Sequence, residues 1–375
     1  MKLAWLGNLG NVGFNYVRLL NTGGIEARLY LPQVRLKALS SSNPENEYQG
    51  ASRESFIHPF SRNYLDYFLN RLGILGPLSG YENLIGNGSG IVQAQTCYEI
   101  AALRIKRKYG IPYAAMATGA DLSEIAFSHT PLGGLYRTAL ENCSHLFLLN
   151  FDQFDTVGRL NLKLKSFGFL PFSINLDRFK RLPNIIREKI IVYSVARLDW
   201  SSATRASTKR NDIFFRGFAR VMAERERADF ELWIADWGVD RIRTRSLIKS
   251  LNIESFVKFI PVGDKNIFYE NLARANVIVD QFNIGSVGLS ALESMAMSRP
   301  VFAYCDRSLA QKAYGSEIPV INCSTDEDVF ARLKELTPGM IARLSERGFD
   351  WIAEHHAEEK ILKILLDTYR GILSD

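Results

Sequence analysis

Short apolar runs alternate with longer segments of helical periodicity through most of the chain. Runs of this length predict buried strands, and strands separated by helical segments predict parallel sheets with crossover helices. In the first half the predicted strands are residues 2–6, 26–31, 90–95, 112–118, 145–150 and 166–170. In the second half they are residues 190–196, 230–235, 256–260, 277–280, 300–304 and 319–321.

The strand and helix alternation occurs twice, and residues 170–189 separate the two series. This stretch carries two prolines and a run of charges, which is typical of an interdomain linker. With 375 residues, the chain exceeds one ordinary core. We therefore predict an α/β protein with domains at residues 1–175 and 176–357. Two helices, at residues 338–355 and 358–373, are predicted near the end of the chain.

The most informative stretch is the loop that follows the predicted strand 277–280. Gly285, Ser286 and Gly288 predict a tight turn, and a helix begins directly after it. The first turn of a helix has unpaired N–H groups, which suit a phosphate. Glu293 follows about one and a half turns later, and its carboxylate can accept two hydrogen bonds from a vicinal diol. This layout predicts a nucleotide site.

Two cations follow the first strand of the second domain. Arg197 comes at the carboxyl end of that strand, and a polar loop leads to Lys209 before a helix. Open parallel sheets bind ligands beyond the carboxyl ends of their strands, so both cations are expected beside residues 285–288. There they would hold a diphosphate. The alternative is a solvated basic loop, because Arg205 and Arg210 lie in the same stretch.

Composition and net charge favour some classes of binding partner over others. The net charge of +6 favours anionic partners such as nucleotide sugars or acidic lipid surfaces. Nucleic acid is disfavoured, because the basic residues form no dense tract. The four cysteines show no metal-binding or disulfide spacing, which indicates reduced thiols and a cytoplasmic location. We find no signal peptide and no apolar run long enough to span a bilayer.

Residues 188–322 resemble the donor-binding half of glycosyltransferase family 4, and the likeness is thinner over the first 187 residues. The strings that carry it are residues 196–209, FELWIADWGVD and VKFIPVGDKNIFYENLARANVIVDQFNIGSVGLSALESMAMSRPV. The resemblance implies a GT-B fold, in which two Rossmann-like domains face each other across a cleft. Residues 1–175 would bind the acceptor and 176–357 the nucleotide-sugar donor, with a helix at 358–375 crossing back to the first domain.

The resemblance also implies an activity and a set of residues. The activity is retaining transfer of a hexose-type sugar to a glycan or lipid-linked acceptor, as in polysaccharide or glycoconjugate synthesis. No protein nucleophile is identifiable, so the leaving phosphate would accept the acceptor's proton, and residues 170–189 would act as a hinge. The matching positions are Arg197 and Lys209 for the diphosphate, Ser286, Val287, Gly288 and Leu289 for the phosphate and sugar, and Glu293 for the ribose.

One position departs from the family pattern. The first glutamate of the E-x7-E signature falls at Gly285, so the carboxylate that usually contacts the transferred sugar is missing. One interpretation is a variant enzyme that uses backbone groups and Asp280 instead. The second is a catalytically silent nucleotide-sugar-binding protein, and the third a sugar-nucleotide epimerase. We favour the variant enzyme, because the cations and Glu293 are kept together.

The first domain contributes two further candidates. Gly10 lies in a glycine-rich loop after the first strand, and the family places this loop against the donor phosphates. The spacing is not that of a dinucleotide site. Asp121 follows Thr118, which stands where the family often has a histidine, and Asp121 is a candidate catalytic residue that binds sugar hydroxyls. Its alternative role is to cap the next helix.

Metal and histidine chemistry find little support. The five histidines are scattered, and the only D-x-D string, at Asp326 and Asp328, has the pattern of a helix start. We predict no metal and no cofactor besides the nucleotide-sugar substrate.

Residues 62–81 and 103–113 combine aromatic and basic side chains. Tyr64, Phe68 and Leu72 have helical spacing, and residues 106–108 are basic, a combination that fits the surface of an anionic bilayer. A helix packed against the core shows the same stripe. Peripheral contact with the inner face of a membrane is therefore one of two interpretations.

Overall fold

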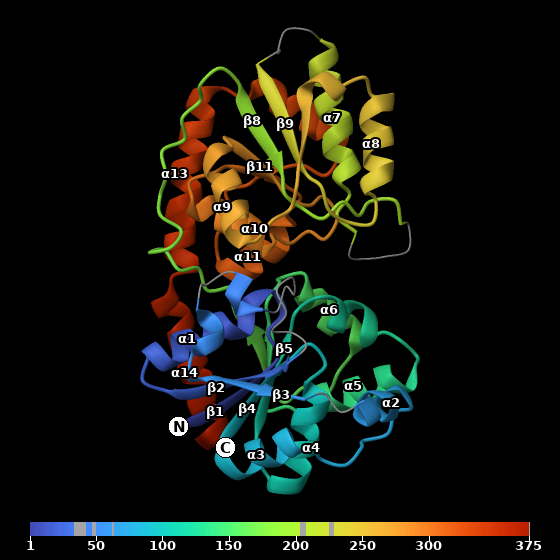
Figure 1. Ribbon diagram of the computed structural model, residues 1–375, viewed down its shortest axis with the longest axis vertical. Coiled ribbons are helices and arrows are strands. Elements are labelled where there is room, and N and C mark those ends of the chain that lie inside the picture. The colour runs from blue at the N-terminus through green and yellow to red at the C-terminus, as the bar shows by residue number, and fades with distance from the viewer. Residues whose placement is uncertain (34–42, 47–49, 62–63, 203–207, 225–228, 375) are drawn as a thin grey trace. The chain divides into compact units, whose positions relative to one another are not determined.

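The chain folds into two α/β units, each built around its own parallel β-sheet (Figure 1). The first unit comprises Met1–Ser173 and Glu358–Asp375, and the second comprises Ile174–Ala357. The computed structural model describes residues 1–33, 43–46, 50–61, 64–202, 208–224 and 229–374.

The first unit contains a seven-stranded sheet with the strand order β3-β2-β1-β4-β5-β6-β7, and every neighbouring pair is parallel. Its described elements are β1 (Lys2–Leu6), η1 (Leu9–Asn11), α1 (Val12–Thr22), β2 (Glu26–Pro32), η3 (Pro44–Asn46), η4 (Ala51–Arg53), β3 (Ile57–Phe60), α2 (Tyr64–Arg71), α3 (Gly80–Gly88), β4 (Ile91–Gln95), α4 (Glu99–Tyr109), β5 (Tyr113–Ala117), η5 (Asp121–Ile125), α5 (Pro131–Glu141), β6 (His145–Leu148), α6 (Gln153–Leu160), β7 (Phe167–Phe169) and α14 (Glu358–Ser374).

Alternate residues of this sheet enter two separate cores, because successive side chains of a strand point to opposite faces. In β1, Leu3 and Trp5 pack with side chains of α1 and α14, whereas Ala4 and Leu6 pack with α4 and α5. Helices cover both faces, as expected for a parallel sheet.

Helix α14 belongs to the first unit although it follows the second unit in the chain. Its apolar stripe, Ile361, Leu365, Tyr369 and Ile372, is buried against the sheet. The Tyr369 hydroxyl donates to Oε1 of Gln93 in β4 at 3.0 Å. The predicted return of this helix to the first domain is therefore confirmed.

The second unit contains a six-stranded parallel sheet with the order β10-β9-β8-β11-β12-β13. Its described elements are β8 (Ile190–Ser194), α7 (Asn211–Ala223), β9 (Phe230–Ala235), α8 (Arg241–Ser250), η6 (Glu254–Phe256), β10 (Val257–Ile260), α9 (Lys265–Arg274), β11 (Val277–Val279), α10 (Leu289–Ala296), β12 (Val301–Ala303), α11 (Arg307–Tyr314), β13 (Ile321–Asn322), α12 (Asp326–Glu335) and α13 (Pro338–His355).

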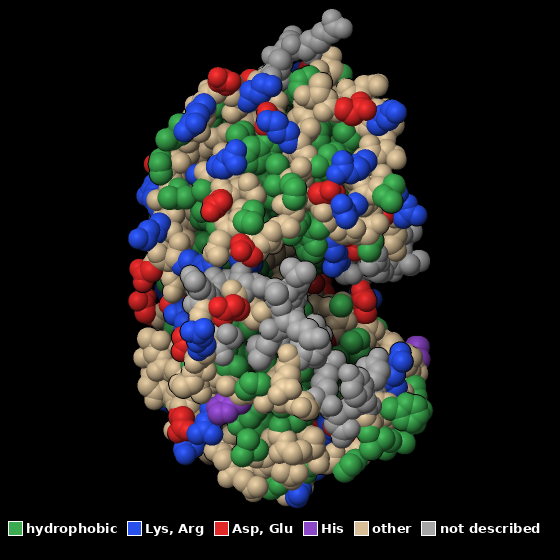
Figure 2. Space-filling model, viewed as in Figure 1, with side chains coloured by type: hydrophobic (Ala, Val, Ile, Leu, Met, Phe, Trp, Pro, Cys, Tyr) green, Lys and Arg blue, Asp and Glu red, His purple; other side chains and the backbone are tan. Residues whose placement is uncertain are grey.

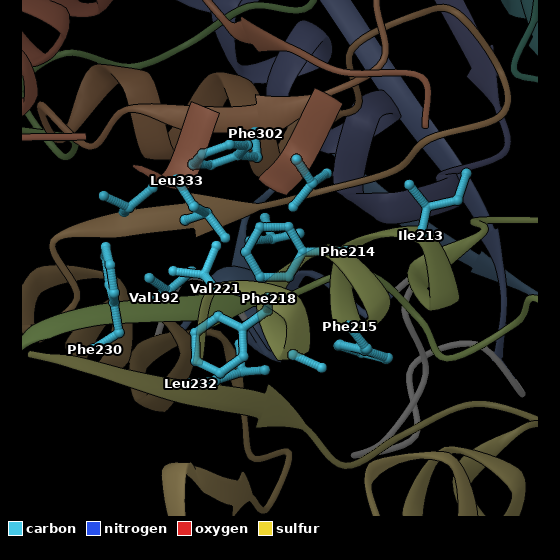
Figure 3. Close-up of a cluster of buried hydrophobic side chains, with 14 of the residues drawn as sticks. Val192, Ile213, Phe214, Phe215, Phe218, Val221, Phe230, Leu232, Phe302 and Leu333 are labelled. Atoms are coloured by element: carbon cyan, nitrogen blue, oxygen red, sulfur yellow. The ribbon is translucent and has the colours of Figure 1, made fainter. Parts of the chain in front are cut away.

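The core of the second unit lies between this sheet and helices α7, α8 and α12. Phe214 and Phe218 of α7 are fully buried and stack at 6.2 Å between ring centroids (Figure 3). They pack in one cluster with Val192 and Leu232 from the strands. Helices α10 and α13 pack against each other, and in Figure 1 they lie across the strands from α8.

Residues 170–189, which the sequence predicts to be an interdomain linker, are for the most part packed in the second unit. Much of this segment is fixed to the second unit: the Asn184 amide donates to the carbonyl of Asn276 at 2.8 Å. The buried guanidinium of Arg299 donates to the carbonyls of Leu182 and Pro183. The change of unit occurs at Ser173, near the start of the predicted linker. The segment is thus mainly a structural part of the second unit.

Candidate functional site

The strand order of the second sheet reverses between β8 and β11. From β8 the chain moves outward through β9 to β10, and from β11 it moves the other way through β12 to β13. In open parallel sheets, ligands are expected beyond the carboxyl ends of the strands at such a switch point. Arg197 and Lys209 lie in the loop after β8, and residues 280–288 form the loop after β11.

Asp199 organises the loop after β8. It is fully buried, and its carboxylate accepts a hydrogen bond from Arg197 at 2.9 Å. Its carbonyl accepts the backbone N–H of Lys209 at 2.6 Å. The two predicted cations are therefore held by one acidic residue. The side chain of Arg197 stays 37% exposed, so it remains accessible to a ligand.

Hydrogen bonds join the two loops. The backbone N–H of Phe282 donates to the carbonyl of Lys209 at 2.9 Å, and the Asn283 amide donates to Thr208 Oγ1 at 3.1 Å. The charge of Lys209 also acts on Asp280, where it opposes a rise of the pKa caused by burial. The structure thus brings Lys209 to the end of β11, where residues 281–288 begin. Arg205, the alternative basic residue of this loop, lies outside the described residues.

Gln281 fixes the shape of the phosphate loop, residues 281–288. Its Oε1 accepts the N–H groups of Asn283 and Ile284 at 2.9 and 2.7 Å, and its amide donates to the carbonyls of Ser286 and Tyr304. A buried side chain that satisfies four backbone groups holds the loop in one conformation. Sequence reasoning missed this residue.

Gly285 occupies the position of the missing family glutamate, and its backbone explains the residue type. Its φ is +74°, which disfavours any residue with a Cβ. A Cβ there would lie 3.3 Å from the Tyr304 ring, and the Gly285 carbonyl accepts the N–H of Asp306 at 2.9 Å. A glutamate at this position would require a different loop.

The anion site predicted at the start of α10 has an unusual neighbour. Gly288 is the N-cap of the helix, and its N–H donates to Oδ2 of the buried Asp280 at 3.2 Å. The following amides, of Leu289 and Ser290, have no carbonyl one turn earlier in the helix. The Ser286 hydroxyl is buried and has no hydrogen-bond partner among the described residues. The site thus offers unsatisfied polar groups to an anion.

Glu293 is buried in α10 and forms an ion pair with Lys265, which the sequence analysis did not predict. Both of its carboxylate oxygens accept from the ammonium of Lys265, at 2.7 and 2.8 Å, and Tyr269 donates to one of them at 3.3 Å. Lys265 comes directly after Asp264, which caps α9. The predicted ribose contact of Glu293 stays a prediction.

The two candidates of the first domain lie in the first unit. Gly10 has φ +58°, in the turn that leads into α1, and open space around its Cα. The carboxylate of Asp121 accepts the N–H groups of Thr118, Gly119 and Leu122 at 2.8 to 3.1 Å, and the Thr118 hydroxyl at 3.0 Å. The N-cap of η5 is Ala120 and makes no side-chain cap hydrogen bond, so the alternative role of Asp121 as an N-cap is wrong, and its carboxylate fixes the turn before the helix instead. Its sugar contact stays a prediction.

The stripe on α2 is exposed, contrary to the interpretation of a helix packed by that face. Phe68 is 59% exposed, and Leu65 and Leu72 are exposed as well. In Figure 2, hydrophobic side chains gather over the region of α2 in the first unit. The Tyr64 side chain lies outside the described atoms.

Neither a cluster of metal ligands nor a bilayer-spanning helix occurs among the described residues. No group of three potential metal-ligating side chains occurs in that part of the chain. Of its helices, none combines the length and apolar character needed to cross a bilayer.

The comparisons with known proteins identify the fold. No protein-family model matches the chain. No curated protein matches it by sequence. Three solved structures are similar over nearly the whole chain: sucrose-phosphate synthase from Thermosynechococcus elongatus, Anabaena HepE in complex with UDP and glucose, and the lipopolysaccharide outer core galactosyltransferase WaaB.

Each of the three similarities covers nearly all of this chain and nearly all of the other protein. The sucrose-phosphate synthase is 14% identical with a TM-score of 0.69, covering 100% of this chain and 99% of that protein. HepE is 13% identical with a TM-score of 0.73, and WaaB is 12% identical with a TM-score of 0.64, each covering 99% of both chains. These neighbours are GT-B glycosyltransferases, so the predicted class of two Rossmann-like α/β units is confirmed.

Proposed function

We propose that the protein is a retaining glycosyltransferase that moves a hexose-type sugar from a nucleotide-sugar donor to a glycan or lipid-linked acceptor. One observation carries the proposal. At the switch point of the second sheet, the loop with Arg197 and Lys209 is hydrogen-bonded to the loop that opens α10. Two cations and a helix N-terminus at this switch point fit the diphosphate of an activated sugar.

The chemistry follows from charge. As the glycosidic bond breaks, negative charge develops on the departing diphosphate, and fixed cations and amides stabilise this charge without reorganisation. Lys209 supplies a compact charge at the phosphate, and Arg197 is held in position by Asp199. Retention then proceeds on one face of the sugar, with the acceptor's proton passing to a phosphate oxygen.

The nucleotide is proposed from the neighbours. HepE has been crystallised with UDP-glucose, and its fold covers 99% of this chain. We therefore propose a UDP-sugar as the first donor to test. The experiment incubates the full chain with UDP-glucose, UDP-galactose and UDP-N-acetylglucosamine and measures UDP release, with and without glycan and lipid-linked acceptors. Release that depends on the acceptor supports the transferase. No release with any nucleotide sugar, including GDP, ADP and TDP sugars, contradicts it.

A second candidate is a protein that binds the nucleotide sugar without transferring it. The specific observation in its favour is Gly285, whose left-handed backbone leaves no side chain where the family has a carboxylate. This candidate predicts saturable UDP-sugar binding with no turnover for any acceptor. The variant-enzyme interpretation predicts turnover that falls when Asp280, the nearby buried carboxylate, is changed to Ala.

The acceptor side is proposed from the first unit. Leu84 of α3 is 59% exposed and follows Asn83, whose side chain accepts from the ammonium of Lys108 in α4 at 3.0 Å. Buried Arg104 ties α4 to α3 through Glu82 and to α2 through Asp66, so the three helices form one fixed surface. Exposed apolar side chains on the same group of helices as Lys108 fit an anionic bilayer, which would present a lipid-linked acceptor.

Vesicle sedimentation tests this surface. The protein is expected to bind vesicles of phosphatidylglycerol more strongly than vesicles of phosphatidylcholine, and the double variant Phe68→Ser, Leu72→Ser should lose most of this binding. Ile242→Ser, which removes an 82% exposed side chain of the second unit, serves as the control and should bind like the parent. Equal binding by all three proteins would exclude the surface as a membrane contact.

A further inference from the structure

A hollow of about 190 Å³ lies at the outer edge of the second sheet, between β13, α11 and α13. We call it the arginine pocket. Its apolar lining residues include Ala310, Ile318, Pro319, Val320 and Leu344. This volume is below the range of about 300–1,000 Å³ of typical ligand pockets, so it suits a small metabolite rather than a whole nucleotide.

Three charged side chains line the arginine pocket: Arg307 at the start of α11, Glu317 before β13, and Arg347 on α13. All three are exposed, and none takes part in an ion pair between described residues. Neighbouring charges on α13 do pair, since Glu346 binds Arg181. Two guanidiniums from separate helices beside one hollow provide forked donors for an anion.

The carboxylate of Glu317 adds a second requirement. An ionised carboxylate only accepts hydrogen bonds, so it favours a ligand that carries hydroxyl groups as well as an anion. An inorganic anion would satisfy the arginines but offers Glu317 no hydroxyl group apart from its charged centre. A hydroxylated phosphate monoester would satisfy all three side chains.

We propose that the arginine pocket binds a small hydroxylated phosphate monoester, with Arg307 and Arg347 on the phosphate and Glu317 on a hydroxyl. The pocket is separate from the phosphate loop, because its lining residues are Cys305 and beyond rather than residues 281–288. The proposal that this pocket binds a ligand does not depend on the proposed sugar transfer.

Backbone contacts connect this pocket to the phosphate loop. The segment 304–306 runs between them: Tyr304 donates to the carbonyl of Gln281 at 2.8 Å, and Asp306 donates to that of Gly285 at 2.9 Å. On the other side, Cys305 exchanges two hydrogen bonds with the Asn322 side chain, at 2.9 and 2.8 Å. Cys305, Arg307 and Asn322 all line the pocket. A ligand that fixes Arg307 and its neighbours also fixes the backbone that supports Gly285 and Gln281.

Isothermal titration of the full chain with glycerol 3-phosphate tests the site. The double variant Arg307→Ala, Arg347→Ala should weaken binding about tenfold or more, because charge-assisted hydrogen bonds to the phosphate are lost. Arg343→Ala, on the same helix and outside the pocket, is the matched control and should bind within about twofold of the parent.

A second pair of titrations separates the pocket from the nucleotide site. Lys209→Ala should keep its affinity for glycerol 3-phosphate and lose affinity for UDP, whereas the double arginine variant should still bind UDP. Glu317→Gln should reduce the preference for glycerol 3-phosphate over inorganic phosphate. The proposal is overturned if the parent protein shows no binding at millimolar glycerol 3-phosphate, if the double variant binds as well as the parent, or if Lys209→Ala abolishes binding.

Discussion

At the scale of single residues, the candidate site is a set of charges held by buried partners. Asp199 holds Arg197, and Lys265 holds Glu293. Asp280 bonds the N-cap of α10, the position at which the sequence predicts a phosphate. The residues identified by the resemblance thus have hydrogen-bond partners that the local sequence does not indicate. Lys265 lies 28 residues before Glu293, and only the packing of α9 beside α10 joins them.

Lys209 is expected to act on the transition state. Lys209→Ala should lower kcat by about 100-fold or more, because a fixed positive charge is removed where the leaving group becomes negative. Lys249→Ala, which changes an exposed lysine of α8, is the control and should leave kcat unchanged. Rates of UDP release at saturating donor give both values, and circular dichroism checks the fold. An unchanged kcat in Lys209→Ala would remove this residue from the mechanism.

Asp280 is expected to make stability depend on pH. Burial raises the pKa of this carboxyl above its ordinary value of 3.8, although Lys209 and the Gly288 amide oppose the rise. The folded protein therefore retains a proton that the unfolded chain loses, so this group costs stability as the pH rises from 3.8 through the folded-state pKa.

The variant Asp280→Asn cannot ionise and keeps an oxygen that accepts the Gly288 N–H. Relative to the parent protein, its free energy of unfolding should therefore increase between pH 3.5 and pH 7, as measured by urea denaturation at both values. If Asp280→Asn changes the free energy of unfolding by the same amount at both pH values, ionisation of Asp280 does not lower the stability of the parent protein.

At the scale of secondary-structure elements, much of the fold could be predicted. The bounds of β1, β9 and α13 match their predicted ranges, because each is a clear apolar run or amphipathic stripe between turn signals. Strand β3 was not predicted: it has only four residues, and Pro59 is one of them. It lies at the edge of the sheet, where the missing N–H of a proline is tolerated.

The candidate site was less predictable than the strands. Tight turns and helix starts have local signals, so the phosphate loop and the position of α10 could be found. Whether a stripe such as Phe68 and Leu72 faces the core or solvent depends on tertiary contacts. The partner of a charge or the support of a loop, as at Gln281, depends on residues far away in the sequence.

Helix α14 is expected to be essential for the first unit. Leu365→Ala should lower the free energy of unfolding of that unit by about 2–5 kcal/mol, because it leaves a cavity against the sheet. Leu373→Ala, which truncates a 46% exposed side chain of the same helix, should change it far less. Chemical denaturation followed by tryptophan fluorescence, with Trp5 buried beside α14, measures both. Similar losses in the two variants would contradict the assignment of α14 to this core.

At the scale of the whole molecule, the two units carry different parts of the proposed function. The second unit holds the predicted donor residues and the arginine pocket, and the first holds the exposed apolar face with its basic neighbours. The net charge of +6 suits both a nucleotide diphosphate and an anionic surface. Each unit has its own core, so changes in the donor site are expected to leave the first unit folded.

The central claim is that the second unit binds a nucleotide diphosphate between the loop after β8 and the start of α10. Hydrogen exchange of the full chain, with and without the nucleotide diphosphate that most raises its melting temperature among UDP, GDP, ADP and TDP, tests this most directly. We predict slower exchange at residues 197–199 and 285–291, and no such change in Lys209→Ala. Protection confined to other segments, with these amides unchanged, would contradict the account.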